Sequence, residues 1–188
     1  MLESQDNMVR FLRISGDYTS WNVYKKAVIV CDVTEMFIRK AFTSPTRTID
    51  QMRQAARSCK QNIVEGTGDS TVSMEMCIKL IGIAKASARE LLEDYRDYLR
   101  QNNLEIWGAN DTRVAQTRKY CLHHDDPHEF VRKCSERSLE SVANIMITQI
   151  HQLDTMLGKV LKEIEADFLR EGGLKEAMSR SRRSQRGY

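Results

Sequence analysis

The sequence predicts an all-α protein, built as an antiparallel up-down four-helix bundle with a helical insert and a basic tail. Apolar residues recur at steps of three or four along four long stretches. The 188 residues include only two prolines and nine glycines, so long helices can run without interruption. Two of the helical patterns meet at a sharp turn containing Gly66 and Gly68, because glycine tolerates the left-handed conformation that ends a helix.

The first two helices have recognisable start and stop signals. Thr19 or Ser20 can cap the first helix, which is expected to end close to Pro45, since the residue before a proline disfavours helical geometry. The segment Thr48-Ile-Asp-Gln51 has the spacing of a capping box. The second helix is therefore predicted to begin there and to run to Val64.

The third helix is predicted to follow the glycine turn directly. Asp69 or Ser70 can cap it, and apolar residues recur at helical spacing from Val72 to Tyr98. It also carries small side chains that would let a neighbouring helix approach closely: Gly82, Ala84, Ala86, Ser87 and Ala88.

The fourth helix has the most regular pattern, with apolar residues recurring from Leu139 to Phe168. Most of this stripe is expected to form the core of the bundle. Ile145, Ile147 and Leu161 widen the stripe beyond one seam, and a helix that is apolar over more than one face often meets a second subunit.

An insert, residues 103–138, separates the third and fourth helices. It contains an amphipathic segment around Val114, Tyr120 and Leu122, then a break at Asp125-Asp126-Pro127 and a short run from Glu129 to Cys134. We therefore divide the chain into a bundle, residues 1–170, and a basic tail, residues 171–188, that is rich in serine and arginine.

Composition argues against a membrane partner. No run approaches the roughly 20 apolar residues that span a bilayer, and the first residues lack the apolar segment of a secretory signal. We therefore expect a cytoplasmic protein, in which the five cysteines stay reduced. The formal net charge of +3 lies in the tail, which holds five basic and two acidic residues. An acidic partner would therefore be attracted mainly to the C-terminus.

Two groups of basic residues are candidates for binding nucleic acid. Arg53, Arg57 and Lys60 form a basic stripe on the second helix, separate from its apolar face. The alternative for this stripe is a solvated face that pairs with acids of a neighbouring helix. The tail supplies four arginines, for which the alternative is a solubilising role: Arg180, Arg182, Arg183 and Arg186.

The second and third helices resemble a family of four-helix bundle proteins encoded in intervening sequences of bacterial ribosomal RNA genes, together with the accessory variability determinants of diversity-generating retroelements. The family pattern is an Arg/Ala-rich helix ending in Asn-Ile-x-Glu-Gly, followed by a helix with Ile-Ala-x-x-Ser and Glu-Leu. The matching residues here are Arg53, Ala55, Ala56, Ser58, Asn62, Ile63, Glu65, Gly66, Ile83, Ala84, Ser87, Glu90 and Leu91. The resemblance covers residues 18–102 and implies a ring-like homo-oligomer, commonly a pentamer.

The same sequence departs from the family in two respects. The turn after Gly66 lacks an arginine that is often found there, and the insert and the tail lengthen the chain beyond the minimal bundle. The tail is similar in position to a suffix region attached to some members of the family.

One cluster in the insert raises the possibility of a zinc site. Cys121, His123, His124, His128 and Cys134 supply soft ligands, but their spacing matches no standard zinc finger. The alternative is a solvated turn with partly buried cysteines. We therefore predict no bound metal and no other cofactor.

The sequence also shows no recognisable catalytic motif. Glu65, Glu75, Glu90, Glu93 and Asp94 could supply carboxylates for hydrolysis, but acids on long helices usually form solvated faces or contact arginines. The glycines after the second helix lack the lysine of a phosphate-binding loop. We expect no enzymatic activity and name no catalytic residue.

Two hypotheses for the function remain open. In the first, a non-enzymatic homo-oligomer, most simply a pentamer, binds RNA, DNA or a reverse transcriptase through its basic surfaces, as the resemblance implies. In the second, the chain is a scaffold for another protein, with the insert and the fourth helix as the interface. Salt dependence separates them, because phosphate contacts weaken steeply with ionic strength.

Overall fold

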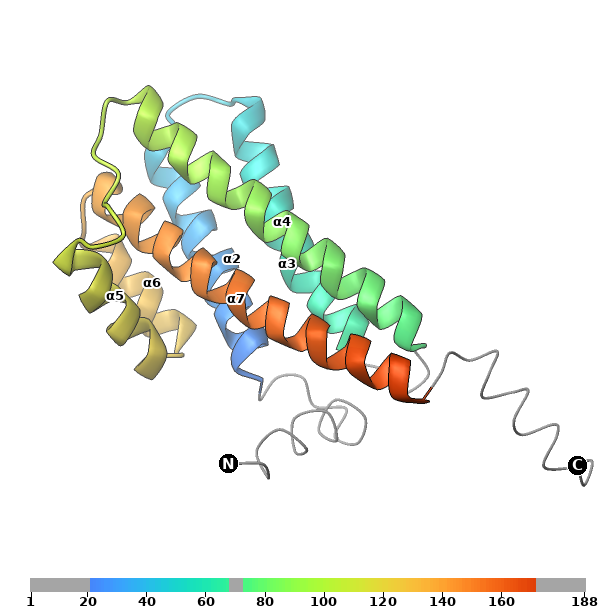
Figure 1. Cartoon of the computed structure of the whole chain (residues 1–188). Coiled ribbons are helices and arrows are strands. Elements are labelled where there is room, and N and C mark those ends of the chain that lie inside the picture. Colours follow the sequence, from blue (N-terminus) through green and yellow to red (C-terminus); the bar gives the residue numbers. More distant parts are fainter. Residues whose placement is uncertain (1–20, 68–72, 172–188) are drawn as a thin grey trace, which may run out of the picture.

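The computed structural model describes residues 21–67 and 73–171, and within these ranges every regular element is an α-helix (Figure 1). The predicted all-α class is confirmed for this part of the chain. The expected caps Thr19, Ser20, Asp69 and Ser70 lie outside the described residues. Six helices follow one another: α2 (Asn22–Ala41), α3 (Arg47–Thr67), α4 (Met74–Gln101), α5 (Thr112–His123), α6 (Pro127–Ser135) and α7 (Leu139–Glu171).

The four long helices α2, α3, α4 and α7 form the main body. α3 packs against α2 and α4, and α7 packs against the same two helices from the other side (Figure 1). Their apolar faces meet in one continuous core, in which Phe37, Met52, Tyr95 and Leu153 are fully buried. The polar end of Tyr95 is satisfied there, because its hydroxyl lies 3.0 Å from Thr34 Oγ1 and shares a hydrogen bond with it.

Small polar residues join α3 to α4. The Ser87 hydroxyl donates to Ser58 Oγ over 3.1 Å, and the Asn62 amide donates to the Ser58 carbonyl over 2.8 Å. These three residues belong to the pattern that carries the family resemblance. In this chain the Ser87–Ser58 hydrogen bond links α4 to α3, whereas Asn62 contacts Ser58 within α3 itself.

Gly66 belongs to the same interface, and the prediction that it ends the second helix is wrong. α3 continues to Thr67, and Gly66 is buried inside it. A Cβ atom at this position would lie 3.2 Å from Leu80 Cβ of α4. The glycine is therefore needed for the close approach of two helices and not for a turn.

Two cap predictions are also wrong. Thr48 was expected to begin a helix from a non-helical position, but α3 already starts at Arg47. The cap of α4 is Ser73, which follows the predicted positions and whose side chain accepts a hydrogen bond from the Met76 amide over 3.2 Å. At the other end, α4 closes with Asn103 in the left-handed region, at φ 53°.

The insert folds as two short helices separated at the predicted break. Asp111 caps α5 and Asp126 caps α6, each by accepting a hydrogen bond from a main-chain amide two residues further on. Pro127 follows in the first turn of α6, where its missing N–H leaves no hydrogen bond unmade. Leu122, which the sequence placed on an apolar face, is 70% exposed.

Lysines of α2 fix the insert to the main body. The buried Lys26 ammonium donates to the Cys121 carbonyl over 3.0 Å, and the Lys40 ammonium donates to the Ser135 carbonyl over 2.6 Å. Both carbonyls lie in the last turn of an insert helix, where the helix dipole favours positive charge. The insert therefore packs on the side of the body formed by α2 and α7 (Figure 1).

The first half of α7 is enclosed on every side. Residues 142–150 are all buried, since α2, α4 and α5 contact this helix. Asn144 adds a clamp by donating to the Glu105 carbonyl and accepting from the Trp107 amide, each over 2.8 Å. Ile145 and Ile147, each 8% exposed, are covered within their own chain. They therefore give no support to a second subunit, and the oligomer stays a prediction.

Candidate functional site

The basic stripe of α3 lies beside acids of α2. Arg53 Nε donates to Glu35 Oε2 over 2.9 Å, and Arg53 also pairs with Asp50 of its own helix over 3.3 Å. The pKa of Glu35 is lowered, chiefly by the hydrogen bond from Arg53. The ionised carboxylate therefore offsets the Arg53 charge, as the alternative interpretation of the stripe anticipated.

Arg57 and Lys60 differ from Arg53. Arg57 is exposed and Lys60 is half-buried, and among the residues that the structure describes neither makes an ion pair or a side-chain hydrogen bond. Both lie near Cys31 of α2, whose thiol pKa is raised by burial and drawn back by Lys60 and Arg57. These two cations are the part of the stripe that remains available to a phosphate. The tail candidates Arg180, Arg182, Arg183 and Arg186 lie outside the described residues.

The cysteine and histidine residues of the insert do not gather into a metal site. Cys121 and Cys134 are buried, whereas His123 and His128 are exposed. The ring of His124 stacks on an aromatic side chain of its own helix, with 3.8 Å between ring centres. Nowhere in the described part of the chain are three or more His, Cys, Asp or Glu side chains placed to hold a metal ion.

The carboxylates of α4 either pair with arginines or lie beside other acids. Glu93 accepts a hydrogen bond from Arg96 one turn away, over 2.6 Å. Asp94 has one buried oxygen without a hydrogen-bond partner among the described residues, and burial raises its pKa to about 6, with Glu90 and Asp97 adding to the effect. Asp94 is therefore surrounded by like charges and lacks a nearby base or nucleophile among these contacts.

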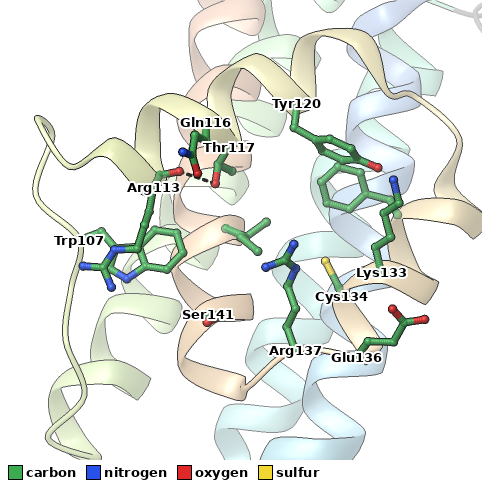
Figure 2. Close-up of a pocket in the computed structure, with 12 residues that line it drawn as sticks. Trp107, Arg113, Gln116, Thr117, Tyr120, Lys133, Cys134, Glu136, Arg137 and Ser141 are labelled. Carbon is green, nitrogen blue, oxygen red and sulfur yellow. Dashed lines mark hydrogen bonds between the residues drawn. The ribbon is translucent and has the colours of Figure 1, made fainter.

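A cavity of about 800 Å³ lies between the insert and the start of α7 (Figure 2). We call it the insert pocket. Its residues come from five segments: the extended stretch before α5, then α5, α6, the turn between α6 and α7, and the beginning of α7. Three apolar and three basic side chains dominate its lining: Phe130, Cys134, Ile145, Arg113, Lys133 and Arg137.

Arg113 forms one wall and already has anionic partners. Its guanidinium donates to Asp111 over 2.6 Å and to Glu105 over 2.9 Å. These hydrogen bonds raise the pKa of Arg113. The same group lies 4.7 Å from the centre of the Trp107 ring and covers that face of the indole.

Lys133 is compensated in a similar way, but Arg137 is not. The Lys133 ammonium lies 2.8 Å from Glu129 Oε1 and 4.6 Å from the centre of the Tyr120 ring. Arg137 makes neither an ion pair nor a side-chain hydrogen bond within the described ranges. Its side chain reaches toward the middle of the pocket, between Ser141 and Cys134 (Figure 2).

Two buried polar atoms of the lining residues lack hydrogen bonds. Trp107 Nε1 and the Tyr120 hydroxyl are both buried, and neither has a partner in the part of the chain that is described. The Tyr120 hydroxyl points toward Lys133 without making a hydrogen bond of normal geometry (Figure 2). Buried polar groups are nearly always paired, so these atoms mark the pocket as a place for a ligand or water.

The sequence interpretation did not identify this pocket. One feature of the sequence could have indicated the pocket. The insert holds a tryptophan, a tyrosine and several basic residues within a short length of chain. Trp107 and Arg137 are far apart in the sequence and on different elements, so no spacing rule connects them.

Comparison of the chain with protein-family models, with curated proteins and with solved structures found no match. Among the described helices, none combines the length and the apolar character needed to cross a membrane.

Proposed function

We propose that this chain is a non-enzymatic binding protein of the cytoplasm, whose partner is RNA, DNA or an enzyme that acts on nucleic acid, such as a reverse transcriptase. The observation that supports this proposal is the pair Arg57 and Lys60, two neighbouring cations of α3 without an acidic partner among the described residues. Such cations bind phosphates without reading bases, so the binding would be weakly sequence-specific.

We further propose an antiparallel up-down four-helix bundle for α2, α3, α4 and α7. Its support is that each of these helices packs against two of the others, and that short connections join α2 to α3 and α3 to α4. The proposed assembly is a homo-oligomer, with a pentamer favoured by the family resemblance. A ring would repeat Arg57 and Lys60 once per subunit and so multiply a modest local charge.

The test is binding of fluorescently labelled RNA and DNA, measured by anisotropy at several salt concentrations. The double variant Arg57→Gln/Lys60→Gln should bind more weakly to unrelated sequences. Its logarithmic salt slope should fall by about 2, one unit per lost phosphate contact. The matched control, Arg118→Gln/Lys119→Gln, removes the same charge from exposed positions of α5 and should retain the parent slope.

A second arm tests the tail. Deleting residues 179–188 removes four arginines and no acid, so affinity and association rate should both fall while the helical content of the bundle is kept. Absence of binding by the parent protein at about 50 mM salt, where phosphate contacts are strongest, would refute the nucleic-acid function.

The second candidate function is a scaffold for another protein. It is favoured by the Glu35 carboxylate, which offsets Arg53 and reduces the positive charge of the α3 surface. A scaffold of this kind would bind its partner with little dependence on salt, because an apolar interface is barely screened. Light scattering provides the check on assembly, since a mass near 21.7 kDa would exclude a pentamer.

A further inference from the structure

We propose that the insert pocket binds a small organic anion, a molecule with an apolar body and one carboxylate or phosphate group that pairs with Arg137. This inference is independent of the α3 surface and of any nucleic acid. It rests on the charges of the pocket, on its unused hydrogen-bond donors and on its size.

The first step concerns charge. Arg113 and Lys133 are held by acids at 2.6–2.9 Å, so their charges are largely offset. The one acidic lining residue, Glu136, accepts a hydrogen bond from Arg132 over 3.2 Å. Arg137 is a solvent-exposed lining residue of the pocket, and it is left without a compensating acid among the described residues. A planar guanidinium suits a carboxylate or a phosphate, because two parallel N–H groups can donate to two oxygens.

The second step concerns hydrogen-bond donors. Trp107 Nε1 can only donate, and it is buried without an acceptor among the described residues. The Tyr120 hydroxyl can donate as well, because the nearby Lys133 ammonium offers its oxygen only a donor and the hydroxyl proton has no acceptor among the described residues. Both atoms are enclosed by neighbouring side chains, so an oxygen acceptor of a ligand reaches them only if those side chains shift. A cationic ligand would offer the indole no acceptor and would be repelled by Arg137.

The third step concerns the body of the ligand. The cavity of about 800 Å³ lies in the range of small-molecule sites, and Phe130, Cys134 and Ile145 give it an apolar side. Arg113 covers one face of Trp107, and the Tyr120 ring is flanked by Lys133 and His124. Burial raises the pKa of the Cys134 thiol to about 12, so this residue stays protonated and the complex is non-covalent.

The experiment uses three probes of similar size on the full-length protein: phenyl phosphate, phenylacetate and the neutral benzyl alcohol. Two-dimensional NMR follows the indole N–H signal of Trp107, which is assigned from its loss in the Trp107→Phe variant. At least one anion should shift this signal and bind about tenfold or more tightly than benzyl alcohol, as expected for a hydrogen-bonded charge. The tighter of the two anions identifies a phosphate or a carboxylate as the natural group.

Arg137→Gln should weaken binding of that anion about tenfold or more, while Arg137→Lys, which keeps the charge, should weaken it less. The matched control Arg118→Gln removes an exposed arginine of α5 that does not line the pocket and should leave affinity unchanged. Three results would overturn the proposal: equal affinity for benzyl alcohol, equal losses in Arg137→Gln and Arg118→Gln, or no binding of either anion up to about 10 mM.

Discussion

The buried ammonium of Lys26 and the main-chain carbonyl of Cys121 meet across 3.0 Å, and this contact ties the insert to the main body. The same ammonium donates to the side-chain oxygens of Gln149 and Gln152, each over 3.0 Å. All three N–H groups of the lysine are therefore used, although no carboxylate is among these partners. Burial lowers the pKa of Lys26, because it disfavours the charged form.

Replacing Lys26 by Met should destabilise the protein by about 2 kcal/mol, since it leaves two buried acceptors and one partly buried acceptor without a donor. Chemical denaturation monitored by circular dichroism is the measurement. Lys25→Met serves as the control, because Lys25 forms a partly exposed pair with Asp125, and such pairs are worth less than about 1 kcal/mol. Equal stability of Lys26→Met and the parent would show that the contact does not hold the insert.

Gly66→Ala and Gly82→Ala should have opposite effects on stability. Alanine favours a helix interior over glycine by about 1 kcal/mol, and a Cβ at Gly82 meets nothing within 4 Å, so Gly82→Ala should stabilise the protein. At Gly66 the new Cβ would crowd Leu80 Cβ at 3.2 Å, and overpacking of this kind costs about 1–3 kcal/mol. Gly66→Ala should therefore melt below Gly82→Ala; the reverse order would show that α3 and α4 can separate slightly without loss.

Asp94 should make stability depend on pH between about 4 and 6. Its pKa is raised from 3.8 to about 6, so its contribution to stability is fully present below pH 3.8 and is lost as pH rises through 6. Asp94→Asn should therefore stabilise the protein at pH 7, by about 1 kcal/mol after allowance for partial exposure. Urea denaturation at pH 4 and pH 7 gives the comparison, with Glu93→Gln as the control because Glu93 is exposed and paired with Arg96. A gain for Asp94→Asn that is the same at both pH values would contradict the assignment.

The buried thiols should resist alkylation in the native state. Burial raises the pKa of Cys59 and of Cys134 to about 12, so neither forms an appreciable amount of thiolate at pH 8. Treatment with iodoacetamide, followed by mass spectrometry of peptides, should label the half-buried Cys31 first and the other two only in urea. Labelling of Cys59 as fast as Cys31 would indicate frequent opening of the contact between α2 and α3.

The spacing of apolar residues was sufficient to place the four long helices, because burial and helical period act on the same side chains. Ile63, Leu91 and Leu153, all of which lie in the predicted helical patterns, are fully buried. The end of α3 could not be predicted in this way, since Gly66 is required by Leu80 of another helix. Local spacing carries no information about such a neighbour.

The insert pocket could not be predicted from the sequence for a related reason. Spacing shows which residues share a helix face, but it does not show which faces meet. Trp107, Arg113 and Arg137 come together only because α5, α6 and α7 pack around them. The basic stripe illustrates the same limit, because the sequence placed Arg53, Arg57 and Lys60 on one face without revealing that Glu35 compensates only the first of them.

The enclosure of residues 142–150 has a consequence for how this chain can change over generations. A version without residues 103–138 would uncover Ile145, which lines the insert pocket, and would leave the Lys26 ammonium without its main-chain acceptor. A version that kept the insert but had polar residues in the first half of α7 would offer the insert no apolar surface to pack against. We therefore expect the insert and the first half of α7 to change together, because each supplies contacts that the other needs.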